Sequence, residues 1–566
     1  MREAVDGLPL TRRPSMPKTA TIQPSVSPAL LTKVTRLFNG SVRDGLSEMF
    51  QNARRAGATE VHVRRRHLND QPTLIVRDDG AGIADPATLL ALGASGWDDE
   101  IAHREDPAGM GVFSLAGKHV VVRSRTPGSL MGWRVTITPE AWSGQIPLLI
   151  EDDDIPVGTE FQVALSDAWR DGLDRAVAAA ARHFPLPVYF QGQPVERSDF
   201  LDGAVKVIGW NGCLIGIFQE GERDATSPTI NFHGVTVPCT LPVIEEVGET
   251  ARWQVKIDIV NAPDLQLVLP ARKEMVECPA LDDLRTAAEW AIFQTISTRD
   301  EHRLSFETWQ RARLFGITLP EAAPRLWEWN ARQADSEAVS FSDLIMDQPM
   351  FLVPPQSVDM EQALDHILTD DNPFGGTPVD AQPKFEGYDW YDRLPRLADI
   401  EAIIDIDGTR HRYGNTGKIP KSVESGRVED IKLRLMVAVS GKPGASLDTY
   451  SFPLDLLICC DDYGGLDEAV VLLRKDVEVE PARLADALEA CCFSFVDDND
   501  CDSWYTQHHD FQQQARALAL TLLLDEEQAL IQQLKDIVDE HLLWLIPEGR
   551  SIEITATRGN LSLSLA

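Results

Sequence analysis

The most constraining feature of the sequence is a helix–strand–strand pattern between residues 44 and 83. The stretch SEMFQNARRAGA carries apolar residues at helical spacing and reaches Gly57, a residue typical of the position just after a helix. Two alternating stretches, 59–66 and 73–78, follow and are separated by turn residues, so they predict a β-hairpin. The pattern predicts an α+β fold.

Two polar residues of the predicted helix share one face with each other. Glu48 and Asn52 are four residues apart, which places their side chains one helical turn apart. Solvated helix surfaces often carry such a pair, so the pair alone identifies no site. Its meaning depends on the motifs that follow.

The second predicted strand runs directly into the turn DDGAGI. Gly80 and Gly82 would let the backbone approach a flat ligand closely, and Asp78 would accept a hydrogen bond from an exocyclic amine. A plain hairpin turn explains the same residues equally well when the motif is taken alone.

A glycine-flanked acidic stretch lies between residues 93 and 111. Gly93 and Gly96 open it, Gly109 and Gly111 close it, and the sequence is apolar and helical in character from Val112. A mobile loop that ends at a helix N-terminus can close over phosphates, because the free N–H groups there face an anion. No GxxxxGK[ST] motif occurs in the chain, which excludes a P-loop site.

The three motifs in this order resemble those of the GHKL ATPase superfamily. Its members include gyrase-type topoisomerases, the ninety-kilodalton heat-shock chaperone, histidine kinases and MutL mismatch-repair proteins. The stretch VGTEF, residues 157–161, resembles the strand that supports the adenine-binding aspartate in that superfamily. The resemblance covers about residues 30–168 and implies a two-layer α/β sandwich that binds ATP and Mg²⁺.

The resemblance also implies roles for individual residues. Glu48 is the general base that activates water, and Asn52 is the Mg²⁺ ligand. Asp78 binds the adenine amino group, with Thr159 behind it, and Gly82 lies against the base. Further ATP contacts are expected in the lid region, at Gly93, Gly109, Met110, Gly111, Val112 and Phe113.

The heat-shock-chaperone branch is the most similar one. GMGVFSLAG resembles a stretch of that chaperone, and residues 262–281 resemble its middle-domain loop, whose arginine reaches the γ-phosphate. Side-chain type favours Arg272 for this role, whereas the gap-free register favours Lys273, so both stay candidates. A surface turn with two solvated cations is the alternative.

The pattern of elements suggests five regions. These are a tail (1–29), the ATPase domain (30–168), an α/β transducer domain (169–300), a helical and linker region (301–396, with irregular structure expected over 347–396) and an α+β C-terminal domain (397–566). In the last region we expect two strands around a Gly-Lys-Pro-Gly turn, helices near 466–475, 481–493 and 505–545, and a final hairpin. The helices there are candidates for a dimer interface or for a local core.

Composition restricts the class of protein. The 566-residue chain has a formal net charge of −35, which argues against a nucleic-acid partner because phosphate backbones require clustered Lys and Arg. Eight cysteines without a CxxC motif and no apolar run long enough to cross a membrane favour a cytoplasmic protein with reduced thiols.

The predicted function is therefore an Mg²⁺-dependent ATP hydrolase. It would act as a conformational clamp on a protein partner, with a homodimer as one arrangement. Two alternatives stay open: a nucleotide-gated interaction protein with little turnover, and a DNA-acting ATPase of the gyrase or mismatch-repair kind.

Overall fold

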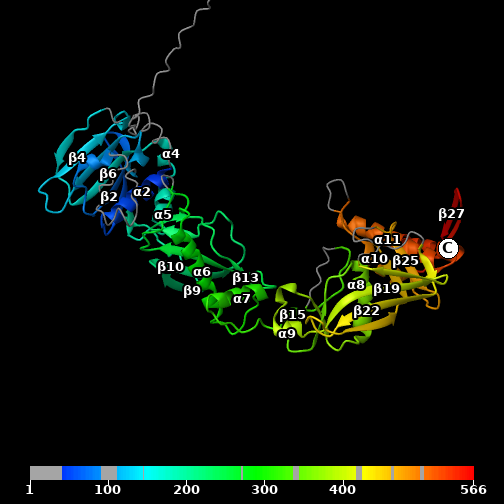
Figure 1. Ribbon diagram of the computed structural model, residues 1–566. Coiled ribbons are helices and arrows are strands. Elements are labelled where there is room, and N and C mark those ends of the chain that lie inside the picture. The colour runs from blue at the N-terminus through cyan, green and yellow to red at the C-terminus, as the bar shows by residue number, and fades with distance from the viewer. Residues whose placement is uncertain are drawn as a thin grey trace, which may run out of the picture. The chain divides into compact units, whose positions relative to one another are not determined.

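The structure is a computed structural model. It describes the chain over residues 41–90, 111–143, 146–268, 272–335, 343–415, 423–460, 465–496 and 502–565. The chain divides into two compact units, one comprising Met1–Asp300 with Leu314–Thr318 and the other Glu301–Arg313 with Leu319–Ala566. Both units contain helices and mixed sheets, so the predicted α+β class is confirmed (Figure 1).

An eight-stranded sheet, ordered β5-β4-β3-β6-β2-β1-β7-β8, begins the first unit. Neighbouring strands run antiparallel except β1 and β7, which are parallel. The predicted hairpin is confirmed, because β1 pairs with β2 along its whole length. The strands are β1 (Val61–Leu68), β2 (Gln71–Asp78), β3 (Val120–Arg125), β4 (Gly132–Ile137), β5 (Ile150–Asp153), β6 (Gly158–Ala164), β7 (Val188–Phe190) and β8 (Gln193–Pro194).

The predicted helix is α2, Val42–Arg55. Ser41 and Asp44 form a capping box at its start, and Gly57, at φ +67°, follows its end as predicted. Leu46, Phe50 and the other apolar side chains of α2 are buried in one core with the inward side chains of the sheet. Two further helices follow the sheet's central strands in the chain, α4 (Asp167–Arg170) and α5 (Leu173–Ala181), and α5 packs against α2.

The segment expected to become helical at Val112 forms only a short 3-10 helix, η2, Gly111–Leu115. The expectation of a longer helix there is wrong, because His119 and the strand β3 follow almost at once. Two other short 3-10 helices lie in this domain, η1 (Pro86–Leu90) and η3 (Ala141–Ser143).

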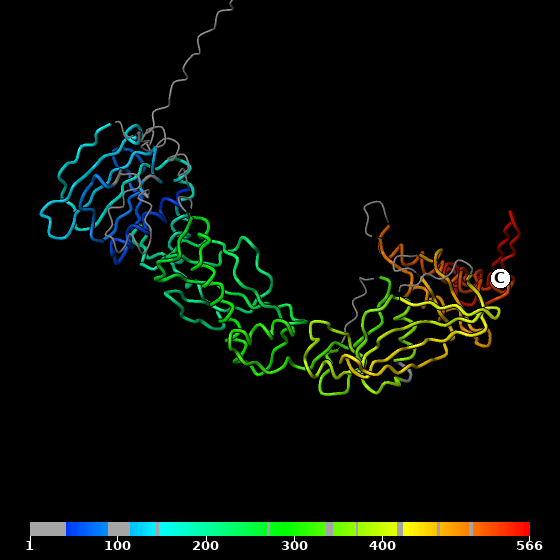
Figure 2. Tube along the Cα trace, viewed as in Figure 1, coloured from blue at the N-terminus to red at the C-terminus, as the bar shows by residue number. Residues whose placement is uncertain are grey.

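A second sheet, ordered β12-β11-β14-β10-β9 with β13 on β14, completes the first unit. The helix α6, Pro279–Ile296, begins at a proline and packs against β9, β10 and β14. The chain path through both sheets can be followed in Figure 2. The strands are β9 (Lys206–Trp210), β10 (Cys213–Glu220), β11 (Ile230–Phe232), β12 (Val235–Val237), β13 (Ile244–Glu245) and β14 (Arg252–Ile259).

The second unit is built on a six-stranded sheet, ordered β18-β17-β19-β22-β23 with β20 on β19. Smaller sheets accompany it, namely β15-β16, β21-β25-β24 and β26-β27. Its strands are β15 (Leu326–Trp327), β16 (Leu344–Ile345), β17 (Met350–Val353), β18 (Thr377–Asp380), β19 (Arg396–Ile406), β20 (Thr409–Gly414), β21 (Gly426–Val428), β22 (Asp430–Ala438), β23 (Leu447–Pro453), β24 (Leu456–Cys459), β25 (Val470–Arg474), β26 (Ile552–Thr557) and β27 (Asn560–Leu565).

The helices of the second part of the chain agree only partly with the predictions. Those near 481–493 and 505–545 are confirmed, as are the strand pair around the Gly-Lys-Pro-Gly turn and the final hairpin. The helices are α7 (Phe306–Leu314), α8 (Val358–Asp371), α9 (Asp389–Asp392), α10 (Pro481–Cys492), α11 (Trp504–Leu523) and α12 (Glu526–His541), with 3-10 turns η4 (Pro383–Phe385) and η5 (Leu543–Leu545).

Two predictions for this part are wrong. Residues 466–475 contain the strand β25, because Val471, Leu472 and Leu473 are all buried and pair with β24, and Leu472 and Leu473 also pair with β21 on the other side. Residues 347–396 are not a linker, since they hold β17, β18 and the amphipathic helix α8, whose Met360 and Leu364 are fully buried. The prolines and glycines of this stretch mark the turns between these elements.

The structure also shows the state of the cysteines and the character of the helices. The seven cysteines in the described ranges are free thiols. Among the helices of the described ranges, none is long and apolar enough to cross a bilayer.

Candidate functional site

The site begins at the end of β2, where Asp78 is 8% exposed. Asp78 lies opposite Thr159 of β6 in the sheet register, the residue to which the resemblance assigns a supporting role. Its Oδ1 accepts a hydrogen bond from the Gly80 N–H at 2.9 Å. Burial raises the pKa of this carboxyl to about 6, although hydrogen bonds from the Gly80 and Thr159 backbone lower it in part.

The turn after Asp78 is held against the end of α2. The Ala81 N–H donates to the Ala56 carbonyl at 2.8 Å. A Cβ atom on Gly80 would lie 2.7 Å from the Ala56 Cβ, so only glycine fits this approach. The turn therefore brings Asp78 close to the helix that carries Glu48 and Asn52.

Gly82 is required by its own surroundings. Its φ is +69°, and a Cβ there would lie 2.3 Å from the Arg125 carbonyl oxygen. The next residue, Ile83, is held from two sides, because its N–H donates to Ser124 Oγ at 2.8 Å and its carbonyl accepts from the Trp133 indole at 2.9 Å. The DDGAGI turn thus has one defined shape.

Ser124 is a site residue that the sequence did not reveal. It is fully buried in β3, and its hydroxyl contacts the Gly158 carbonyl at 3.0 Å and Thr159 Oγ1 at 3.1 Å. It connects the DDGAGI turn to the strand that lies opposite Asp78. A single serine in an alternating strand gives no local signal of such a role.

Glu48 meets a cation from the second sheet's domain. Its Oε2 lies 2.6 Å from Nη1 of Arg272, and the two side chains are 13% and 14% exposed. Lys273, the next residue, is exposed to solvent. Of the two cations that the sequence left open, the structure thus brings Arg272 to the predicted base.

The backbone explains this choice. Arg272 has φ +50°, and its N–H donates to the Val268 carbonyl at 2.8 Å. Beyond it, the chain forms a bridge between Leu267 and Met275. A second link, from Gln51 Nε2 to the His233 carbonyl at 2.5 Å, joins α2 to the same domain.

Asn52 of α2 is paired with an arginine of the same helix. Its Oδ1 accepts a hydrogen bond from Nη1 of Arg55 at 3.2 Å, and the same Arg55 atom is 4.0 Å from Glu48 Oε1. In this arrangement the amide oxygen that would bind Mg²⁺ is already paired with a guanidinium. The side chains as arranged therefore do not fit a metal ion at Asn52.

The remaining predicted residues are placed as follows. Val112 is half-buried against the core, and Gly111 and Phe113 belong to η2. Gly93, Gly109 and Met110 lie outside the described residues. Among the side chains that are described, no three His, Cys, Asp or Glu residues gather in a way suited to a metal ion.

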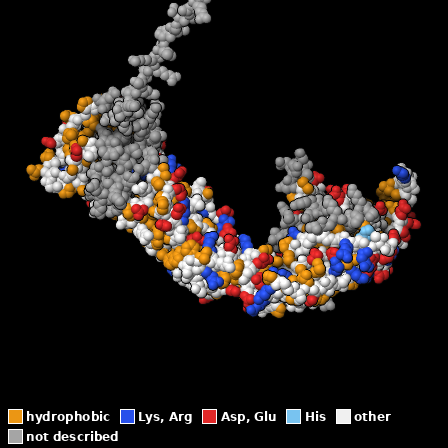
Figure 3. Space-filling view, in the orientation of Figure 1, with side chains coloured by type: hydrophobic (Ala, Val, Ile, Leu, Met, Phe, Trp, Pro, Cys, Tyr) orange, Lys and Arg blue, Asp and Glu red, His pale blue; other side chains and the backbone are white. Residues whose placement is uncertain are grey.

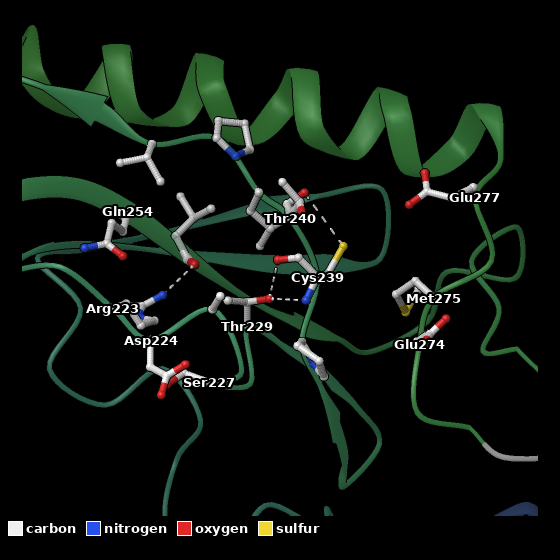
Figure 4. Close-up of a pocket in the computed structure, with 16 residues that line it drawn as sticks. Arg223, Asp224, Ser227, Thr229, Cys239, Thr240, Gln254, Glu274, Met275 and Glu277 are labelled. Carbon is white, nitrogen blue, oxygen red and sulfur yellow. Dashed lines mark hydrogen bonds between the residues drawn. The ribbon is translucent and has the colours of Figure 1, made fainter.

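A cavity of about 430 Å³ borders the segment that carries Arg272. Glu274, Met275 and Glu277 line one end of it, and Gln254 and residues of the 223–229 loop line the other (Figure 4). Its wall is stiffened by reciprocal hydrogen bonds between Thr229 and Cys239, each 2.8 Å long. The segment after Arg272 thus borders this cavity as well as the candidate site.

Comparisons with known proteins add no assignment. No protein-family model matches the chain, and no curated protein is similar to it in sequence.

Proposed function

We propose that the chain is an ATP hydrolase of the GHKL class, nearest the heat-shock-chaperone branch, in which nucleotide drives a conformational clamp on a protein partner. The single observation that carries the proposal is the contact between Glu48 and Arg272. A carboxylate of α2 and a guanidinium from a distant segment of the first unit meet on the helix whose end holds the turn after the buried Asp78. Hydrolysis of a phosphoanhydride needs a residue that activates or orients water and a cation that stabilises the developing charge.

The proposed reaction uses these residues in sequence. Asp78 accepts a hydrogen bond from the adenine amino group, which orients the nucleotide. Arg272 leaves Glu48 for the γ-phosphate, so that the carboxylate is available to a water molecule. Glu48 accepts a proton from this water as its oxygen bonds to the γ-phosphorus. The bond from that phosphorus to the bridging oxygen breaks, and ADP leaves with the electron pair.

The test separates binding from chemistry. Asp78→Asn should lose affinity for ATP in a calorimetric titration, because a buried acceptor is replaced by a group that can present an NH₂ to the adenine amine, at about 1–3 kcal/mol. Glu48→Ala should lose phosphate release by about 10²–10⁴-fold and still bind ATP. Wild-type affinity in Asp78→Asn would remove the adenine site from the proposal.

One alternative is a nucleotide-gated interaction protein with little turnover. The ion pair supports this alternative, because Arg272 is bound to the carboxylate that would otherwise activate water. Single-turnover hydrolysis by the full chain distinguishes the two, since a gated binder releases no phosphate on the time scale of binding. A DNA-acting ATPase is the other alternative, and the net charge of −35 disfavours it.

The proposal also includes a homodimer, in which a second copy of the chain binds the C-terminal hairpin. One face of the β26–β27 hairpin is wholly apolar, formed by Ile552, Ile554, Ala556, Leu561, Leu563 and Leu565. Leu561, Leu563 and Leu565 are 63%, 60% and 51% exposed, and hydrophobic side chains are visible over this end of the chain in Figure 3. A two-stranded sheet of this kind is marginal in water without a covering surface.

The complement to this face is present in the same chain. The helix α12 exposes Leu530, Leu534 and Ile537, each more than half exposed, and carries more acidic than basic side chains, whereas β27 bears no charge. The uncharged edge of β27 is open to pairing. Leu563→Asp should convert a dimer to a monomer in sedimentation equilibrium, and Thr555→Asp, on the polar face, should not. A monomeric wild-type chain would refute this arrangement.

A further inference from the structure

A second arginine lies inside the candidate site and has no part in the reaction described above. Arg55 belongs to the last turn of α2, and its side chain is only 4% exposed. Glu48, Asn52 and Arg55 are spaced by four and three residues, so they form one stripe along the helix. Arg55 is the last residue of this stripe, and its guanidinium contacts both Asn52 and Glu48.

The contacts of Arg55 conflict with a metal ion at Asn52. Its Nη1 donates to Asn52 Oδ1 at 3.2 Å, which is the atom that the resemblance assigns to Mg²⁺. A divalent cation bound to that oxygen would face a buried positive charge at close range, and such repulsion is weakly screened in a buried site. The arginine and the metal ion therefore compete for one position.

The local charges already suit an anion without a metal. Glu48 is the carboxylate of this cluster, and two guanidinium groups lie within 4.0 Å of its oxygens, from Arg272 and Arg55. These three side chains together carry a net positive charge, in a chain whose total is −35. A guanidinium also presents several N–H donors in a planar fork that matches phosphate oxygens.

We propose that Arg55 is a nucleotide-phosphate ligand that supplies, beside Asn52, the positive charge for which the resemblance invokes Mg²⁺. The inference rests on the proposed function, because it concerns the phosphates of the same nucleotide. Its consequence is that nucleotide binding persists when divalent cations are removed. Arg55 gives the phosphates a fixed, buried cation that needs no loading from solution.

The test is calorimetric titration of the full chain with a non-hydrolysable ATP analogue, in excess EDTA and in excess Mg²⁺. The wild-type dissociation constant should differ by less than about fivefold between the two conditions. Arg55→Gln should weaken metal-free binding by about tenfold or more, the effect of losing one charge-assisted hydrogen bond. Mg²⁺ should restore part of that affinity, because Asn52 Oδ1 is then open to it.

Two further variants keep the test interpretable. Arg54→Gln is the matched control, since it removes the neighbouring arginine of α2, whose Nε donates to Gln51 Oε1 at 3.4 Å, and its affinity should equal that of the wild type. Arg55→Lys retains the buried charge and should keep most metal-free binding even if Arg55→Gln fails to fold.

The outcomes separate this inference from the proposed function. Wild-type binding that disappears in EDTA, with Arg55→Lys equally dependent on Mg²⁺, overturns the role of Arg55 and leaves the ATPase proposal standing. A chain that binds the analogue in neither condition overturns both.

Discussion

The ion pair between Glu48 and Arg272 predicts that removing the base tightens ATP binding. In the structure Arg272 Nη1 lies 2.6 Å from Glu48 Oε2, and both side chains are mostly buried. A hydrogen bond to a charged group contributes about 1.5–3 kcal/mol, and the lower part of that range applies because both side chains keep some contact with water. ATP must break this pair before Arg272 can reach the γ-phosphate.

The expected size follows from that energy. In Glu48→Ala, Arg272 has no carboxylate to leave, so the full-chain affinity for ATP should rise by about tenfold, the equivalent of about 1.4 kcal/mol. Arg272→Ala should remove the gain, because the gain depends on the freed guanidinium. The double variant should therefore bind ATP no more tightly than Arg272→Ala alone.

The assay is calorimetric titration of four chains, namely the wild type, the two single variants and the double variant. Lys273→Ala is the matched control, since Lys273 is the adjacent cation and is exposed to solvent. Equal affinity of wild type and Glu48→Ala would refute the reasoning. A double variant that binds as tightly as Glu48→Ala would refute it also, because the gain would then not pass through Arg272.

Four further predictions concern the same site. Arg272→Ala should reduce ATP turnover, measured as phosphate release, by about 10²–10³-fold, because it removes a cation from the reacting centre. Lys273→Ala removes no such cation, so its turnover should stay within about twofold of the wild type. ATP affinity should fall by up to about tenfold between pH 7 and pH 5, because the Asp78 pKa of about 6 leaves about a tenth of the carboxyl ionised at pH 5. The affinity of the Asp78→Asn chain should show no such pH dependence. The same shift means that the folded state binds more protons than the unfolded state between pH 3.8 and about 6. The contribution of Asp78 to the free energy of unfolding is therefore greatest at low pH and declines as the pH rises through that window, which thermal unfolding at several pH values would measure. Gly82→Ala should abolish nucleotide binding and lower the unfolding temperature, because its Cβ would lie 2.3 Å from a backbone oxygen. Gly57→Ala is the control, since Gly57 has φ +67° with open space around it. This variant should lose only about 1 kcal/mol of stability and keep its affinity for nucleotide.

Local sequence determined the elements that frame the site. Ser41, Asp44 and Gly57 set the ends of α2 through contacts within a few residues, and the alternation of β1 and β2 set the hairpin. Asp78 and Gly82 were recognisable because the end of a strand and a positive φ each restrict which residue types can occupy the position. Such features depend on near neighbours, so they can be predicted without the rest of the fold.

Contacts between distant segments were decided only by the tertiary structure. Which of Arg272 and Lys273 meets Glu48 depends on how their segment packs against α2: Arg272, at φ +50°, reaches the carboxylate, and Lys273 is exposed to solvent. The link from Ser124 to Ile83 and the pairing of β25 on both sides also required segments far apart in the chain to come together. Arg55 could have been noticed at three residues from Asn52, but its hydrogen bond to that residue depends on a rotamer that burial selects. The sequence carries the residue types of such contacts, and packing alone determines which of them touch.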